Sequence, residues 1–179
     1  MGRAKLFVAS FLVTVAMAAG AQACSVARVS GADAVVQAGK ALNQKLIDAA
    51  IRAEVNFHRC RSGLKPLSAS RNLSQIAKTH ANWMARSQTL SHKSRVSGQG
   101  TLKARLSTSG VRFRAGSENI GMVHRFRIDG QRFQIRNASA CQFATNGGQP
   151  IPPHSYQSLA RHIVTLWMKS PGHRKNILD

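Results

Sequence analysis

The chain has 179 residues, a length that fits one domain together with processing segments. Hydrophobic residues make up 43% of it and charged residues 18%, which argues against wholesale disorder. The 26 Lys and Arg residues outnumber the 6 Asp and Glu residues, so the formal net charge is +20. This charge indicates a polyanionic partner, with anionic lipid, envelope polyanions and nucleic acid as alternatives, although a basic surface that only maintains solubility has the same composition.

The first 23 residues have the pattern of a secretory signal peptide. Arg3 and Lys5 precede an apolar run over residues 6–19, and Ala21-Gln22-Ala23 follows as a small-residue cleavage site. The apolar run is too short for a permanent membrane-spanning helix, and no later segment is a transmembrane candidate. We therefore expect cleavage after Ala23 and a secreted, periplasmic or extracellular protein.

The chain contains three cysteines, Cys24, Cys60 and Cys141. An oxidising compartment permits a disulfide, and an odd count leaves one cysteine over. Cys24 directly follows the cleavage point, where a lipoprotein carries its lipid-modified cysteine, and Cys60 with Cys141 is then the candidate disulfide. Gln22 and Ala21 suit a lipoprotein cleavage site poorly, so simple secretion is favoured and a lipid anchor on Cys24 is the minor alternative.

Periodicity along the mature chain predicts mainly helices. Residues 24–39 are small and weakly apolar and predict a flexible lead-in, followed by one domain over residues 40–179. Apolar residues recur at helical spacing over residues 40–61. Capping residues and the same spacing predict four further helices, one after the N-cap Ser70 with an apolar stripe from Leu73 to Met84, and others over residues 101–109, 155–169 and 171–178.

The period changes between residues 124 and 136. Residues 124–128 and 131–136 alternate apolar and polar side chains around Asp129-Gly130, a dipeptide typical of a two-residue hairpin turn. In this register Phe126 lies opposite Phe133 on one face. The other face is rich in arginines that suit either solvent or a polyanion, namely Arg125, Arg127, Arg132 and Arg136. The sequence of helices, hairpin and helices predicts an α+β fold in a single domain.

Few residues stand out as candidates for chemistry. Glu118 is the only carboxylate between Glu54 and Asp129, and a structural salt bridge to an arginine is the alternative to a functional role. Among the histidines, His80 lies on an apolar helical stripe and is expected in the core. His92 and His173 lie at helix boundaries, where side chains can converge on a cleft.

Several motifs from residue 46 to residue 178 resemble the CAP superfamily of cysteine-rich secretory, antigen 5 and pathogenesis-related proteins, in its bacterial, SCP-like form. The order and spacing of the motifs match that family. They are Asn56-Phe57-His58-Arg59 with Gly63-Leu64-Lys65-Pro66-Leu67, the stripe Ala77, His80, Ala81 and Met84, then Leu90-Ser91-His92, Ser117-Glu118-Asn119-Ile120, and the stretch from Trp167 through Ser170-Pro171-Gly172-His173-Arg174 to Asn176-Ile177-Leu178.

The resemblance implies an α-β-α sandwich with a large cleft that two histidines and two glutamates line. Carried over onto this chain, the histidines are His92 and His173 and the first glutamate is Glu118, the one candidate for a catalytic role. Ser170 stands at the position of the second glutamate. Two imidazoles form an open site for zinc or another divalent cation, with modest affinity that is lost as they protonate below about pH 6.

Three features depart from the family pattern. Ser117 replaces the glycine before Glu118, and the Arg-rich hairpin insertion at about residues 123–153 is longer than in compact bacterial members. The chain stops at Asp179, where family members continue into strands that complete the central sheet, so the chain resembles a truncated form in which the closing strands are missing.

The resemblance and the charge together favour a secreted, monomeric binding module for an anionic, lipid or envelope ligand, with nucleic acid not excluded. The alternative is a metal-assisted hydrolase, a peptidase or nuclease, that uses the His/Glu cleft. Binding is favoured because the sequence has no recognisable nucleophile and no third strong metal ligand. A third reading makes the cleft a structural relic without a ligand.

Overall fold

The computed structural model describes residues 24–179, and the predicted signal peptide, residues 1–23, lies outside them. The described chain is a single α+β domain, as predicted. Its elements in chain order are α1 (Gln44–Arg61), α2 (Arg71–Ser87), α3 (Leu102–Thr108), β1 (Phe133–Asn137), β2 (Gln142–Thr145), α4 (Tyr156–Lys169) and α5 (Pro171–Leu178). All five predicted helices are confirmed.

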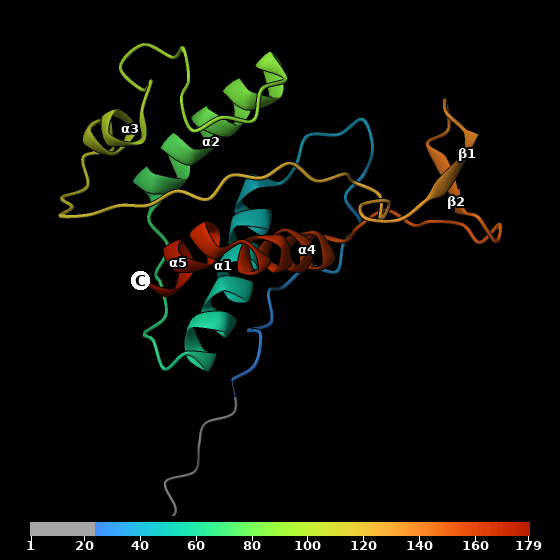
Figure 1. Cartoon of the computed structure of the whole chain (residues 1–179), viewed down its shortest axis with the longest axis horizontal. Helices are drawn as coiled ribbons and strands as arrows, with labels where there is room; N and C mark the ends of the chain where they lie inside the picture. Colours follow the sequence, from blue (N-terminus) through green and yellow to red (C-terminus); the bar gives the residue numbers. More distant parts are fainter. Residues whose placement is uncertain (1–23) are drawn as a thin grey trace, which may run out of the picture.

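The core lies between α1, α4 and α5, which form the centre of the molecule (Figure 1). Ala50 of α1 and Ala160 of α4 are completely buried, and their small side chains let the two helix axes approach closely. Ile47 and Leu159 belong to the same cluster, and a second cluster joins α1 to α4 and α5 around the fully buried Val164. Burial of such aliphatic side chains is the main stabilising term of the domain.

Residues 24–39 do not form a flexible lead-in, because they pack against the core. Ala32 and Val36 are 2% and 1% exposed in the cluster between α1 and α4. The carbonyls of Ala34 and Ala32 accept hydrogen bonds from the backbone N–H groups of Tyr156 and Gln157, over 3.1 and 2.8 Å. Those N–H groups belong to the first turn of α4 and have no partner within the helix, so the segment completes the capping of α4.

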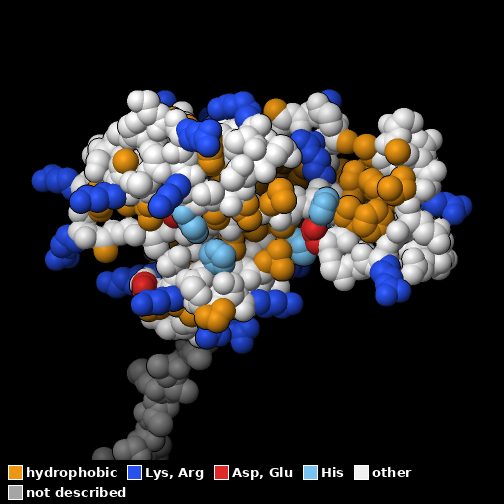
Figure 2. Space-filling view, turned by 45° about the horizontal axis from the view of Figure 1, so that its top comes forward, with side chains coloured by type: hydrophobic (Ala, Val, Ile, Leu, Met, Phe, Trp, Pro, Cys, Tyr) orange, Lys and Arg blue, Asp and Glu red, His pale blue; other side chains and the backbone are white. Residues whose placement is uncertain are grey.

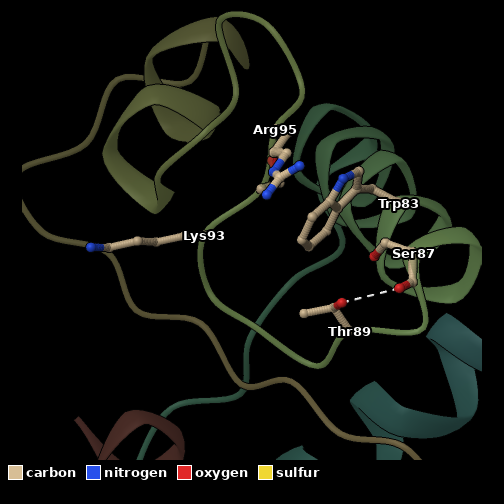
Figure 3. A pocket seen from close by; sticks show the side chains of 6 residues that line it. Trp83, Ser87, Thr89, Lys93 and Arg95 are labelled. Carbon is tan, nitrogen blue, oxygen red and sulfur yellow. Dashed lines mark hydrogen bonds between the residues drawn. The ribbon is translucent and has the colours of Figure 1, made fainter.

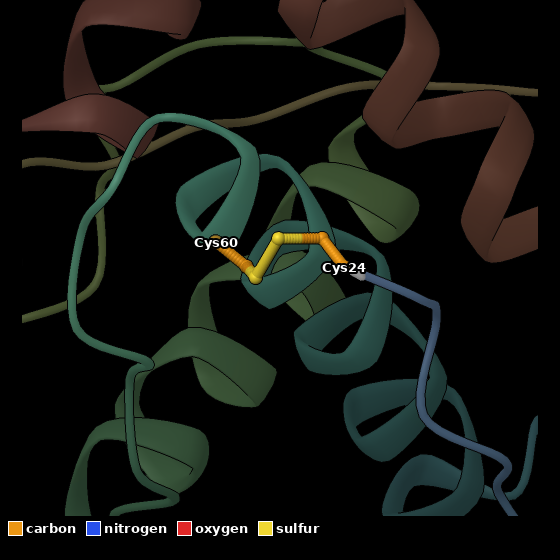
Figure 4. Close-up of a disulfide and its surroundings, with 2 residues drawn as sticks. All are labelled: Cys24 and Cys60. Carbon is orange, nitrogen blue, oxygen red and sulfur yellow. A yellow bond between two sulfur atoms is a disulfide. The ribbon is translucent and has the colours of Figure 1, made fainter. Parts of the chain in front are cut away.

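The disulfide joins Cys24 to Cys60, with 5.8 Å between their Cα atoms (Figure 4). Cys141 is a free thiol. The predicted pair of Cys60 with Cys141 is therefore wrong. Packing of residues 24–39 along the core brings Cys24 to the last turn of α1, whereas Cys141 lies in the turn between β1 and β2. The sulfur of Cys24 is engaged in this bond and is not free to carry a lipid.

The hairpin is present, but its turn is not at Asp129-Gly130. β1 and β2 pair antiparallel with Phe133 opposite Thr145 and Ile135 opposite Phe143, so the chain reverses over residues 138–141. Phe126 does not pair with Phe133. Its ring instead contacts that of Phe143, with 4.8 Å between the ring centroids.

The Asp129 carboxylate explains this difference. Its oxygens accept hydrogen bonds from the backbone N–H and Nδ1 of His124, and Oδ2 lies 3.3 Å from Nε2 of His162 on α4. These contacts, together with the burial of Ile128, fold residues 124–130 against α4 instead of leaving them extended. Desolvation alone would raise the pKa of Asp129, but the hydrogen bonds and charge of His124 outweigh it and hold that pKa below its ordinary value.

Within residues 24–179 the strands are limited to this two-stranded hairpin, which lies at one end of the molecule and not between helix layers (Figure 1). The space between α2 and the central helices is instead crossed by an extended segment, residues 111–124. Gly121 of this segment approaches the side chain of Ile163 on α4, and Ile120 accepts a hydrogen bond from the Trp167 indole over 3.0 Å. This segment carries Glu118.

The disulfide assignment can be tested by substitution. Cys24→Ser opens a cross-link between residues 36 positions apart, and this should lower the free energy of unfolding by about 3 kcal/mol because the unfolded chain gains entropy. Cys141→Ser should leave it within about 0.5 kcal/mol of the wild type. Urea denaturation measures both, and a proteolytic fragment that links Cys60 to Cys141 would contradict the assignment.

The burial of the His154 ring predicts that the folded protein loses stability in mild acid. Its ring is 5% exposed and stacks 5.5 Å from that of His162. Burial, and then the charges of His162 and Arg127, lower the pKa of His154 against the opposing effect of Asp129. Because the folded state disfavours the protonated ring, this part of the stability is fully present above the unfolded pKa of about 6.5 and is lost as the pH falls from there through the lower pKa of the folded state.

His154→Gln cannot take up this proton, so the urea midpoint of the variant should fall less between neutral and mildly acidic pH than that of the wild type. Identical pH slopes for the two proteins would show that His154 does not contribute.

Candidate functional site

Glu118 lies at the centre of a polar cluster that joins four segments of the chain. Arg105 comes from α3, His92 from the loop after α2, and Asn176 from α5, whereas Glu118 itself lies on the extended segment. The Nη2 atom of Arg105 lies 2.7 Å from both carboxylate oxygens. The Arg105 side chain is 1% exposed and that of Glu118 14%, so the guanidinium is fully buried and depends on the carboxylate to neutralise its charge.

Arg105 also fixes the loop in front of the carboxylate. Nη2 donates to the carbonyl of His92 over 3.0 Å, and Nη1 donates to the carbonyl of Gln99 over 3.1 Å. One buried guanidinium therefore holds both ends of the loop over residues 92–99 and the carboxylate. The sequence motifs do not single out Arg105 for this role, although the sequence allows a structural salt bridge between Glu118 and an arginine.

His92 is oriented by Glu118. Its Nδ1 lies 2.9 Å from Oε1, and the side chain is 54% exposed. The carboxylate only accepts hydrogen bonds, so Nδ1 is the donor and Nε2 carries the free lone pair. A carboxylate that sets the tautomer in this way prepares the second ring nitrogen as a base, a hydrogen-bond acceptor or a metal ligand.

His80 lies under this pair, in the core as predicted. It is 2% exposed, and its Nε2 donates to the carbonyl of Ser91 over 2.9 Å while remaining 4.0 Å from Oε1 of Glu118. Burial, and then the charge of Arg105, lower the pKa of His80. A neutral ring at this position supports the loop that carries His92 without competing for the carboxylate.

His173 and Ser170 lie beside this cluster but are not joined to it through their side chains. Nδ1 of His173 lies 2.9 Å from the hydroxyl of Ser170, which consequently does not cap α5. The backbone of His173 accepts a hydrogen bond from Asn119 over 3.0 Å. Within residues 24–179 no hydrogen bond or ion pair connects the His173 ring to His92 or Glu118, so the four expected cleft residues form two separate pairs, His92 with Glu118 and His173 with Ser170.

A hollow of about 450 Å³ opens in front of His92 and Glu118. Lys93 lines this hollow and also borders a neighbouring one of about 420 Å³ beside Trp83. In Figure 3 the Lys93 side chain points away from the Trp83 ring. The remaining residues that line the hollow at His92 are Thr101, Leu102, Gly116, Ser117 and Asn176.

The profile of the CAP family, described as the cysteine-rich secretory protein family, matches residues 52–179. The chain belongs to the CAP family. No curated protein and no solved structure matches it. The match covers the whole polar cluster around Glu118, together with α2 to α5 and the hairpin. Members of this family are typically extracellular, and no helix among residues 24–179 is long and apolar enough to cross a membrane.

As a CAP domain, the chain has an incomplete donor set for a metal centre. Within residues 24–179 no group of three or more His, Cys, Asp or Glu side chains could hold an ion together. His92 and His173 each have Nδ1 engaged by an oxygen partner, which leaves Nε2 available. Because a closed zinc site takes four protein ligands, these two nitrogens do not form one by themselves.

The four arginines of the predicted ribbon do not share one face, so that prediction is wrong. Arg125 donates to the carbonyls of Gln37 and Lys40 and ties residues 37–40 to the domain. Arg127 belongs to the turn that folds against α4, and only Arg132 and Arg136 lie at or beside β1. The latter three side chains are exposed.

Arg105→Met tests the importance of the buried pair. The methionine fills much of the same space but removes the buried cation that pairs with Glu118 and leaves His92 as its only partner among those described above, which should cost about 3–5 kcal/mol of stability. The matched control is Arg112→Met, at an exposed position after α3, which should change stability by less than about 0.5 kcal/mol. Equal effects of the two substitutions in thermal or urea unfolding would contradict a special role for Arg105.

Proposed function

We propose that this CAP domain is an exported binding module whose hollow at His92 takes an anionic, hydroxyl-rich ligand of the envelope-glycan class. The observation that carries the proposal is the His92–Glu118 hydrogen bond of 2.9 Å at the edge of a hollow that Lys93 also lines. The free Nε2 of His92 accepts a hydrogen bond from a ligand hydroxyl. The Lys93 ammonium pairs with an acidic group on the same ligand.

The charge of the chain supports an anionic ligand. A formal net charge of +20 creates a positive field that draws anions toward the protein from a distance and weakens with added salt. The family match and the signal-peptide pattern of residues 1–23 support export, so an envelope or extracellular ligand fits the compartment.

A metal-assisted hydrolase, either a peptidase or a nuclease, is the weaker candidate. His92 would be its general base and Glu118 its acid or water-orienting group. However, Glu118 already accepts two contacts from Arg105 and one from His92, which leaves it little capacity for a substrate. Within residues 24–179 no Ser, Thr or Cys side chain is hydrogen-bonded to His92 as a nucleophile would be.

A divalent cation such as zinc remains part of the proposal as an accessory ligand. His92 and His173 would hold it through Nε2, with water or the glycan in the other positions. Two imidazoles supply only part of a coordination shell, so they bind a cation only modestly. The proposal for glycan binding does not require the cation.

Calorimetric titration with oligogalacturonate, an acidic oligosaccharide, tests the proposed function. The wild type should bind it at low salt, and a neutral galactose oligomer should bind at least about tenfold more weakly. His92→Ala and Lys93→Ala should each weaken binding by roughly tenfold because each removes one polar contact. Added zinc should strengthen binding to the wild type but not to His92→Ala.

The matched control is Lys103→Ala, which removes the same charge from an exposed position on α3 outside the hollow. If Lys103→Ala and Lys93→Ala weaken binding equally, the hollow is not the ligand site and only the overall charge attracts the glycan.

A further inference from the structure

The β1–β2 hairpin carries an apolar patch that faces outward. Antiparallel pairing places Phe133, Ile135 and Phe143 on one face, and the ring of Phe126 contacts that of Phe143. We call these four residues the hairpin patch. Phe133 is 38% and Ile135 is 63% exposed. Figure 2 shows hydrophobic side chains gathered at the end of the molecule that holds the hairpin.

The outward side chains of Phe133 and Ile135 are not covered by another segment of the described chain. The opposite face of the hairpin is the covered one, because Ala144 is only 2% exposed and forms a bridge to Pro150. The hairpin contacts residues 149–151 and Phe126, and it stands away from the helices in Figure 1. Natural proteins rarely leave such exposed aromatic and aliphatic side chains together unless they contact a partner.

The segment that contains the hairpin carries a net positive charge. Residues 123–153 contain four arginines and a single acid, Asp129, and therefore have a net charge of +3. The Asp129 carboxylate is engaged by His124 and lies close to His162. Arg132 directly precedes Phe133, Arg136 directly follows Ile135, and both side chains are exposed. Nη1 of Arg136 donates to the side chain of Gln134 over 3.3 Å, on the face of β1 opposite Phe133 and Ile135. The two arginines therefore flank the hairpin patch at its margin, where their long side chains can reach a surface that the patch contacts.

An anionic lipid surface satisfies both features at once. Aromatic and aliphatic side chains enter the boundary between headgroups and acyl chains, while neighbouring arginines remain at the level of the phosphates. A second copy of this chain would bring two strongly positive surfaces together. Nucleic acid would use the arginines and aromatic rings, but it offers no apolar phase for Ile135.

We propose that the β1–β2 hairpin is a membrane-docking element that binds anionic lipid surfaces through the hairpin patch, with Arg132 and Arg136 at the headgroups. The hairpin thereby holds the domain at the envelope, where the hollow at His92 meets its ligand. This inference names a second partner for the proposed binding module and depends on the proposed function only for export. It does not need the hollow to bind anything.

Co-sedimentation with vesicles tests the proposal, using phosphatidylcholine alone and phosphatidylcholine mixed with phosphatidylglycerol. The wild type should bind only the mixed vesicles, and less at high salt. Ile135→Asp should lower the partition coefficient by at least about tenfold, since it places a carboxylate at the lipid boundary. Met122→Asp is the matched control, because Met122 is 79% exposed but lies outside the hairpin. It should bind nearly as the wild type does.

Charge is tested with a second matched pair of variants. Arg132→Gln with Arg136→Gln should weaken vesicle binding several-fold more than Arg71→Gln with Arg112→Gln, which removes two exposed charges elsewhere. If the two double variants behave alike and Ile135→Asp binds as the wild type does, the hairpin is not the docking element. Circular dichroism of each variant confirms that it is folded.

The free thiol of Cys141 in the hairpin turn gives an independent readout. A polarity-sensitive dye on Cys141 should shift its emission to shorter wavelength with mixed vesicles, and no shift would contradict insertion. Competition with duplex DNA distinguishes a lipid site from a nucleic-acid site. If DNA displaces the protein from vesicles and Ile135→Asp binds DNA as tightly as the wild type does, the hairpin is a nucleic-acid site and the proposal is overturned.

Glycan binding at the hollow and lipid binding at the hairpin can be contradicted independently of each other. Ile135→Asp should retain oligogalacturonate binding, and His92→Ala should retain vesicle binding. Loss of both activities in Ile135→Asp, with the fold intact, would show that glycan and lipid share one surface and would overturn the separate role of the hairpin.

Discussion

The arrangement of the site depends on the buried ion pair between Arg105 and Glu118. Removing two charges from water is costly, and the pair is stable only because Nη2 reaches both carboxylate oxygens at 2.7 Å and the guanidinium also satisfies two loop carbonyls. The extended segment with Glu118 has no strand partner among residues 24–179. Its position is therefore set by side-chain contacts, chiefly this pair and the bonds from Asn176 and Trp167.

The sequence predicted the helices well because the information for them is local. Apolar spacing and a capping side chain lie within one or two turns, as at Ser70, whose hydroxyl accepts from the backbone of Leu73. The disulfide and the hairpin register are not local. Cys24 reaches Cys60 only because residues 32–36 pack against α1 and bond to the start of α4. Asp129 does not lie in the expected hairpin turn because its carboxylate contacts the ring of His162, which is 33 positions later in the chain.

Prediction of the site was similarly uneven. His92 and Glu118 were identified by resemblance to the CAP family, and the structure joins them directly. The same motifs placed His173 and Ser170 in the cleft, but those side chains bond to each other instead. Arg105 was missed because its neighbours do not distinguish it. Lys103, two positions earlier, is exposed, and only the folded chain shows that the Arg105 side chain is buried.

The few acids of the chain are engaged locally, so they offset little of the positive charge at the surface. Glu54 is 3% exposed and paired with Arg161 and Gln157, Glu118 is paired with Arg105, and Asp129 with His124. Because these carboxylates neutralise interior or adjacent groups, most surface lysines and arginines have no acid to offset them. Such a surface attracts any polyanion, so charge alone cannot select a partner. Selectivity has to come from shape and apolar contact, and the described chain offers these in the hollow at His92 and the hairpin patch.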